Sequence, residues 1–132
     1  MFNDRRPGEV LVVDDEFAMR QILSGWIDAA GFEVTAAPDA ETALEILAER
    51  DIAVVTVDKD MPGHDGMWLV RKIQERHPKV AMLLATGDPA ITPRVSLSEG
   101  VLGYLVKPFV PEDVVRAVVV GVRWHFDEAP GA

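Results

Sequence analysis

The chain has 132 residues, a net charge of −9 and no cysteine, with 48% hydrophobic and 27% charged residues. These values indicate one folded domain and exclude intrinsic disorder, disulfides and cysteine chemistry. No apolar run approaches the ~20 residues of a membrane span, and the N-terminal segment does not have the pattern of a signal peptide. We therefore expect a cytoplasmic protein without membrane contact. Residues 1–66 carry a net charge of −10 and the remainder +1, which disfavours direct nucleic-acid binding.

Short apolar runs alternate with helical patterns along the chain. The predicted strands cover residues 10–13, 33–36, 53–57, 80–84 and 103–106. Helical periodicity covers residues 19–30, 40–48 and 67–77, and a last helix begins at Pro111. Asp39 is predicted to cap the second helix, and Gly31 to follow the end of the first. Residues 88–99 predict only a short helix, because Pro89 and Pro93 interrupt it.

This alternation predicts an α/β fold with a parallel sheet and helices on both faces. We expect a flexible N-terminus over residues 1–8, one domain over residues 9–125 and a C-terminal tail over residues 126–132. The tail resembles the start of a linker, which favours an N-terminal piece of a longer protein over a complete single-domain one.

Polar residues follow four of the predicted strands. In parallel sheets ligands bind at the carboxyl ends of the strands. Asp14 and Asp15 follow the first strand, and Asp58 follows the third. If these strands are neighbours, the three carboxylates converge and repel one another unless a cation lies between them. Oxygen ligands of this kind suit Mg²⁺.

Thr86 and Lys107 follow the fourth and fifth strands. A hydroxyl and an ammonium opposite the carboxylates suit an anion, and the whole set is typical of a phosphoryl-transfer site. An aspartate carboxylate can itself be the nucleophile. Each feature alone is more often an ordinary cap or turn, but their joint placement at strand ends favours the functional interpretation.

Three segments, residues 12–16, 57–66 and 103–109, resemble the response-regulator receiver domain, the phospho-acceptor module of two-component signalling. The resemblance covers residues 9–125. It implies a flavodoxin-like, doubly wound sheet of strand order 2-1-3-4-5 and Mg²⁺ as cofactor. It also implies a histidine kinase or a histidine phosphotransfer protein as partner. The domain would catalyse only its own phosphorylation and autodephosphorylation.

The resemblance assigns a role to each polar residue. Asp58 matches the phosphorylated aspartate. Asp14 and Asp15 match the acidic pair that holds Mg²⁺ together with Asp58, and Asp15 is the more direct ligand. The backbone carbonyl of Asp60 matches the third protein contribution to the metal. Asp60 and Asp88 also occupy the two positions that tune the rate of dephosphorylation, and the phosphoryl lifetime stays open.

The remaining matches concern the switch. Thr86 matches the hydroxyl that turns toward the phosphoryl group, and Lys107 matches the lysine that pairs with it. Tyr104 matches the aromatic residue that rotates inward when the threonine moves. The bond before Pro108 is expected to be cis. The output face would comprise residues 88–99, the strand 103–106 and the last helix, and would contact a second copy or an output domain.

The last helix is apolar on more sides than one buried stripe requires. We predict that its outer face, with Trp124, contacts a partner or a second copy of the chain. The alternative is that its valines are merely tolerated at the surface.

The sequence leaves two alternative functions. Asp58 and Asp60 form an Asp-x-Asp pair that resembles haloacid-dehalogenase phosphohydrolases, which also use an aspartyl phosphate and Mg²⁺. However, the metal-binding acids precede this pair here, whereas in that family they follow it. The other alternative is a phosphorylation-independent pseudo-receiver, which the complete set of polar residues disfavours.

Overall fold

The fold is a five-stranded parallel sheet in the order β2-β1-β3-β4-β5. The computed structural model describes residues 8–87 and 100–130. Its strands are β1 (Glu9–Val13), β2 (Glu33–Ala37), β3 (Ile52–Asp58), β4 (Ala81–Thr86) and β5 (Gly103–Val106). Its helices are α1 (Phe17–Ala29), α2 (Ala40–Glu49), α3 (Gly66–Arg76) and α5 (Pro111–Asp127). The predicted fold class and strand order are confirmed, with boundaries shifted by one or two residues.

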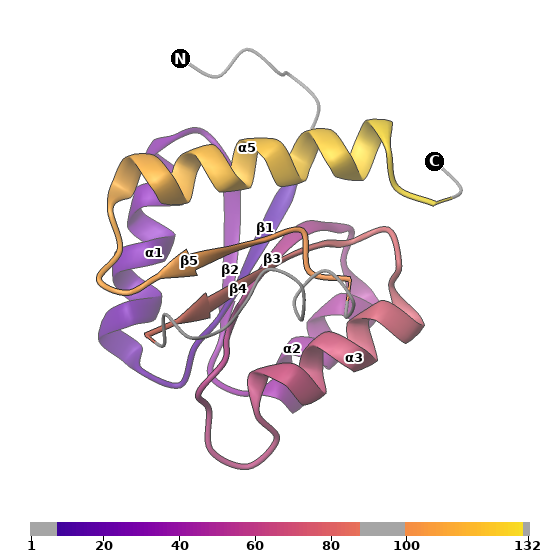
Figure 1. Cartoon of the computed structure of the whole chain (residues 1–132), viewed down its shortest axis with the longest axis horizontal. Coiled ribbons are helices and arrows are strands. Elements are labelled where there is room, and N and C mark those ends of the chain that lie inside the picture. The colour runs from indigo at the N-terminus through magenta and orange to yellow at the C-terminus, as the bar shows by residue number, and fades with distance from the viewer. Residues whose placement is uncertain (1–7, 88–99, 131–132) are drawn as a thin grey trace.

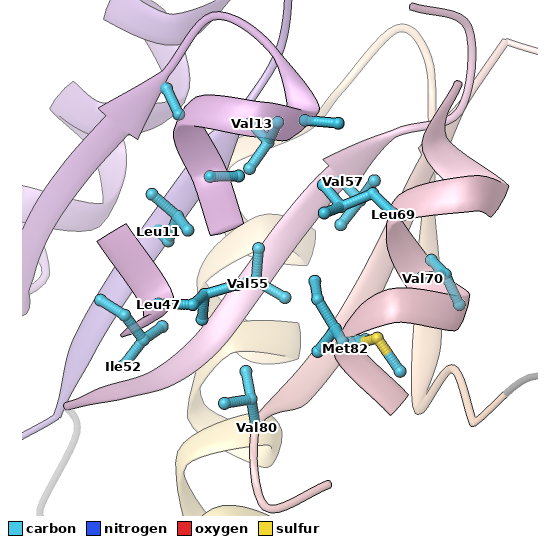
Figure 2. Packing of buried hydrophobic residues seen from close by; sticks show 14 of the residues in the cluster. Leu11, Val13, Leu47, Ile52, Val55, Val57, Leu69, Val70, Val80 and Met82 are labelled. Atoms are coloured by element: carbon cyan, nitrogen blue, oxygen red, sulfur yellow. The ribbon is translucent and has the colours of Figure 1, made fainter. Parts of the chain in front are cut away.

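The helices cover both faces of the sheet (Figure 1). α1 and α5 pack on one face over Val10, Val12 and Val54. α2 and α3 pack on the other, where Leu47 and Leu69 meet residues of β1, β3 and β4 (Figure 2). Because both faces are covered, the central strands are apolar at nearly every position, which is why they read as continuous hydrophobic runs.

Local signals set the helix ends. The Asp39 carboxylate accepts a hydrogen bond from the Thr42 N–H at 2.8 Å and caps α2, as predicted. Gly31 follows the end of α1 with a φ of +100°, which suits glycine. Asp65 caps α3 by accepting from the Trp68 N–H at 2.9 Å, a cap that the sequence analysis did not predict.

α5 extends to Asp127, two residues past the predicted domain boundary at residue 125. Trp124 and Phe126 pack against the core on the α1 side, and Ala129 is buried. His125 Nδ1 lies 2.6 Å from the carbonyl oxygen of Lys79. The first residues of the predicted tail are therefore part of the folded domain, because their apolar side chains continue the buried stripe of the helix.

Several predictions lie outside the described residues. They are the flexible N-terminus over residues 1–7, the short helix within residues 88–99, Asp88 itself and the last two residues. Within residues 8–87 and 100–130, no helix combines the length and the hydropathy that a membrane span requires.

Candidate functional site

The register of the sheet brings the predicted polar residues to one edge, which we call the carboxyl edge: the residues that end or directly follow β1, β3, β4 and β5. Val13 pairs with Val57, so Asp14 and Asp58 lie on adjacent strands. Thr86 ends β4 and pairs with Val106, which directly precedes Lys107. The sheet order places β1 and β3 at its centre, where the strand order reverses and ligands of such sheets bind.

Three carboxylates form an acidic cluster at this edge. Asp14, Asp15 and Asp58 each offer an oxygen, and these oxygens all lie within 4.8 Å of one another. Asp14 and Asp58 are buried, with 1% and 2% of their surface exposed, whereas Asp15 is exposed. Like charges this close, two of them away from water, disfavour joint ionisation unless a cation compensates them.

Asp14 shows this conflict most clearly. Its Oδ1 accepts the N–H of Glu16 at 2.9 Å, but its buried Oδ2 has no hydrogen-bond partner within the described part of the chain. Burial, and then the negative charges of Asp58 and Asp15, raise the pKa of Asp14 from 3.8 to about 6, against the opposing effects of the Glu16 N–H and of Lys107. A buried carboxylate oxygen without a donor fits a site for a hard cation.

Asp58 is held from two directions. Its Oδ1 accepts from the Lys107 ammonium at 3.3 Å and from the Asp60 N–H at 3.1 Å. Lys107 reaches across from the end of β5, and its peptide bond to Pro108 is cis, as expected. One cation therefore already faces the cluster of three carboxylates, which leaves the cluster with an excess of negative charge.

The loop between β3 and α3 closes tightly on the site. The Gly66 N–H donates to the Lys59 carbonyl at 3.1 Å. A Cβ on Gly66 would collide with the backbone oxygen of Asp58 and with the Cα of Lys59, so glycine is required by this close approach. The Asp60 carboxylate is largely exposed and lies 3.9 Å from the Lys59 ammonium. The backbone of Asp60 is thus at the site while its carboxylate faces the rim.

Comparison with known proteins identifies the family. The chain matches the family of response regulator receiver domains over residues 10–119. It belongs to this family. It is 39% identical over 125 residues to the response regulator protein FleR of Pseudomonas aeruginosa, with 94% of this chain covered. The aligned part is 26% of the length of FleR, so the chain spans about a quarter of this relative.

Solved structures agree with this receiver-domain fold. The chemotaxis protein CheY4 of Vibrio cholerae superposes with a TM-score of 0.78 at 29% identity, covering 86% of this chain and 97% of that one. The signal receiver domain of an HD domain-containing protein from Pseudomonas fluorescens gives a TM-score of 0.84 at 28% identity, covering 91% and 98%. Receiver domains are signalling domains of two-component systems and generally bind Mg²⁺ at an acidic pocket, which the Asp14, Asp15 and Asp58 cluster matches.

The two remaining residues predicted for the switch, Thr86 and Tyr104, lie on β4 and β5 of this receiver domain. Thr86 is buried at the end of β4, and its carbonyl accepts the Lys107 N–H at 2.8 Å. Tyr104 is half-buried and packs against the core on the α2 and α3 side. Its hydroxyl is buried without a hydrogen-bond partner in the described ranges. An unpaired buried hydroxyl costs about 1–3 kcal/mol, and no hydrogen bond from residues 8–87 or 100–130 offsets this cost for Tyr104.

One residue of the receiver site was missed by the sequence analysis. Arg20 Nη1 donates to the backbone carbonyl of Asp14 at 2.7 Å, and its guanidinium lies 5.6 Å from the ring centroid of Phe17. Arg20 therefore fixes the turn that carries Asp14 and Asp15 and adds positive charge near the cluster. Its position six residues after Asp14 is an ordinary helical one, and only the structure shows that its side chain folds back onto the turn.

Proposed function

We propose that this receiver domain accepts a phosphoryl group on Asp58 from a phosphohistidine of a histidine kinase or a histidine phosphotransfer protein. The observation that carries the proposal is the convergence at the carboxyl edge of three carboxylates and one ammonium. Asp58 Oδ1 is engaged by Lys107 and by the Asp60 N–H, which leaves Oδ2 to act as the nucleophile. This oxygen belongs to a side chain that the sheet holds rigidly at the end of a central strand.

The residues at this edge fit Mg²⁺. The ligand atoms are carboxylate and carbonyl oxygens, which this ion prefers, and Asp14 Oδ2 has no hydrogen-bond partner within residues 8–87 and 100–130. Asp14, Asp15 and Asp58 would hold the ion with the backbone carbonyl of Asp60. When bound, Mg²⁺ neutralises charge on the carboxylates and on the oxygens of the incoming phosphoryl group.

The reaction exchanges one bond to phosphorus for another. The phosphorus–nitrogen bond of the phosphohistidine breaks while Asp58 Oδ2 forms a phosphorus–oxygen bond, and the imidazole leaves and takes a proton from water. Lys107, which already faces Asp58, stays with the phosphoryl oxygens and stabilises their charge. The product is an aspartyl phosphate on a rigid strand end.

The partner would meet an apolar rim around this site. Phe17, Val106 and Val110 are 65%, 48% and 46% exposed, and each stands at the start of a helix or the end of a strand at the carboxyl edge. Exposed apolar side chains beside a charged centre are typical of a surface that a protein partner covers.

Phosphorylation would then shift the population between two states of the face formed by β5 and α5. Thr86 would hydrogen-bond a phosphoryl oxygen, and Tyr104 would move with it. A groove of about 430 Å³ runs between β5 and α5, with Val106, Val110 and Val120 in its lining. We propose that this face, with residues 88–99, contacts an output domain or a second copy of the chain.

The lifetime of the aspartyl phosphate depends on how water reaches it. The Asp60 carboxylate lies at the exposed rim, two positions after Asp58, where it would repel or orient that water. Asp88 is proposed to act in the same way, and it lies outside the described residues.

The test is intact mass after incubation with acetyl phosphate and Mg²⁺. We expect one added phosphoryl group on the wild type and none on Asp58→Asn or in the presence of a chelator. Asp60→Asn is the matched control, because it keeps the backbone carbonyl and should still gain the adduct. Absence of the adduct in the wild type, together with no change in tryptophan fluorescence on adding beryllofluoride, would contradict the proposal and favour a pseudo-receiver. The haloacid-dehalogenase alternative has no support from the family to which the chain belongs.

A further inference from the structure

His64, at the exposed tip of the loop between β3 and α3, contacts two helices. The His64 ring stacks on the Trp68 ring of α3, with centroids 3.7 Å apart and an interplanar angle of 11°. Its Nε2 lies 3.6 Å from Glu41 Oε1 in the first turn of α2, an ion pair when the imidazole is protonated. Lys72 Nζ lies 5.6 Å from the Trp68 centroid. The receiver-domain assignment accounts for none of these contacts.

The base of the same loop is fixed separately. The Lys59 N–H donates to the Ala85 carbonyl at 2.8 Å, and Gly66 closes the loop against Lys59. Met61 is buried in the core on the α2 and α3 side. The loop is therefore held at its base by the backbone, in its middle by a buried side chain and at its tip by His64.

Asp60 lies between the base and the tip. Ordering the backbone of a residue costs conformational entropy. If the tip of the loop is mobile, the Asp60 carbonyl must be ordered when the ion binds, and this entropy cost lowers the Mg²⁺ affinity. If the tip is already ordered, the cost is absent and the Mg²⁺ affinity is higher.

We propose that His64, stacked on Trp68 and facing Glu41, is a positioning residue that pre-orders this loop so that the Asp60 carbonyl can bind Mg²⁺. The inference rests on the proposed metal site. His64 does not contact the ion but acts through the three residues, 61–63, that separate it from Asp60. Trp68 supplies a fixed platform because it is partly buried against the core.

The exposure of the His64 and Glu41 side chains allows an effect on Mg²⁺ binding to be distinguished from an effect on folding stability. The side chains of His64 and Glu41 are 49% and 60% exposed. Exposed pairs of this kind add little to folding stability, so their loss should leave the fold nearly unchanged. A marked loss of Mg²⁺ affinity without a comparable loss of melting temperature would therefore identify a positioning role.

The experiment measures Mg²⁺ affinity by calorimetry and melting temperature for the same set of full-chain variants. His64→Ala is expected to weaken Mg²⁺ binding about three- to tenfold. His64→Phe keeps the stack and should stay within about twofold of the wild type, and Glu41→Gln, which also keeps the stack, should do the same. Glu45→Gln, an exposed acid one turn further along α2, is the matched control and should bind like the wild type.

Faster amide exchange over residues 60–64 in His64→Ala, without metal, would support the same role independently. Wild-type affinity in His64→Ala would overturn the inference while leaving the metal site intact. Equal weakening in His64→Ala and His64→Phe would also overturn it. No Mg²⁺ binding by the wild type would instead overturn the proposed metal site, and this inference with it.

Discussion

Each end of the sheet buries a carboxylate, and the two carboxylates differ in their hydrogen-bond and charge partners. At the amino end, Glu9 is 9% exposed, and both of its oxygens have partners. The Nε of Arg50 donates to Oε1 of Glu9 at 3.1 Å, and the Nη2 of Arg50 lies 2.8 Å from Oε2. The Thr35 hydroxyl also donates to Oε2, at 2.5 Å. At the carboxyl end, Asp14 is 1% exposed and lies among other carboxylates, and its Oδ2 has no hydrogen-bond partner among the described residues.

The difference indicates which end is built for a ligand. Burial of a charge is costly unless hydrogen bonds and an opposite charge compensate it. The chain supplies this compensation for Glu9 from its own residues. For Asp14 it supplies only part, although Lys107 and Arg20 lie nearby. A site that the protein leaves under-compensated is a candidate for a bound cation.

The largest expected effect comes from breaking the compensation at the amino end. Arg50→Met should lower the free energy of unfolding by about 2 kcal/mol, because it leaves Glu9 buried without its cation. The measurement is urea denaturation. Arg116→Met is the matched control, since the Arg116 and Asp113 side chains are both mostly exposed and their loss should cost less than about 0.5 kcal/mol. Equal effects of the two substitutions would show that Glu9 does not depend on Arg50.

A smaller effect of opposite sign is expected at the carboxyl end. Without metal, Asp14→Asn should raise the free energy of unfolding at neutral pH by about 1 kcal/mol, because it removes one of three mutually repelling carboxylates. Glu9→Gln, the corresponding change at the amino end, should lower it. Equal destabilisation of the metal-free protein by Asp14→Asn and Glu9→Gln would show that the two carboxylates are compensated alike.

The pH dependence of stability should distinguish the two ends further. Since the pKa of Asp14 is raised from 3.8 to about 6 on folding, the folded protein binds more protons than the unfolded chain between these values. The stabilising contribution of protonated Asp14 is complete below the lower value and is lost as the pH rises through the upper one. The stability gap between wild type and Asp14→Asn should therefore close near pH 4 and widen toward pH 7. A gap that does not change with pH would contradict the assigned pKa.

Much of the site could be predicted because its residues stand directly after strands. Asp14, Asp58, Thr86 and Lys107 were each found as the first polar residues beyond an apolar run, and parallel pairing brings such positions together. The sheet could be predicted from the alternation of strand-like and helix-like hydrophobic patterns alone, because these patterns are visible in short stretches of sequence.

The contacts that were missed depend on side-chain direction or on distant pairing. Arg50 and Glu9 are 41 residues apart and meet only through the sheet register. Arg20 folds back on the turn before its helix, and His64 stacks on a tryptophan four positions later. The packing of Phe126 against the core, within the last turn of α5, also could not be predicted from the sequence pattern. No period or spacing in the sequence distinguishes these side chains from ordinary surface ones.

The most direct test of the central claim, that the carboxyl edge is left under-compensated for a cation, is thermal unfolding with and without excess Mg²⁺. The account predicts that Mg²⁺ raises the melting temperature of the wild type by about 3–6 °C, because the ion binds only the folded state. Glu9→Gln should keep this increase, and Asp15→Asn, which changes an exposed ligand, should lose most of it. An equal increase in all three proteins, or none in the wild type, would contradict the claim.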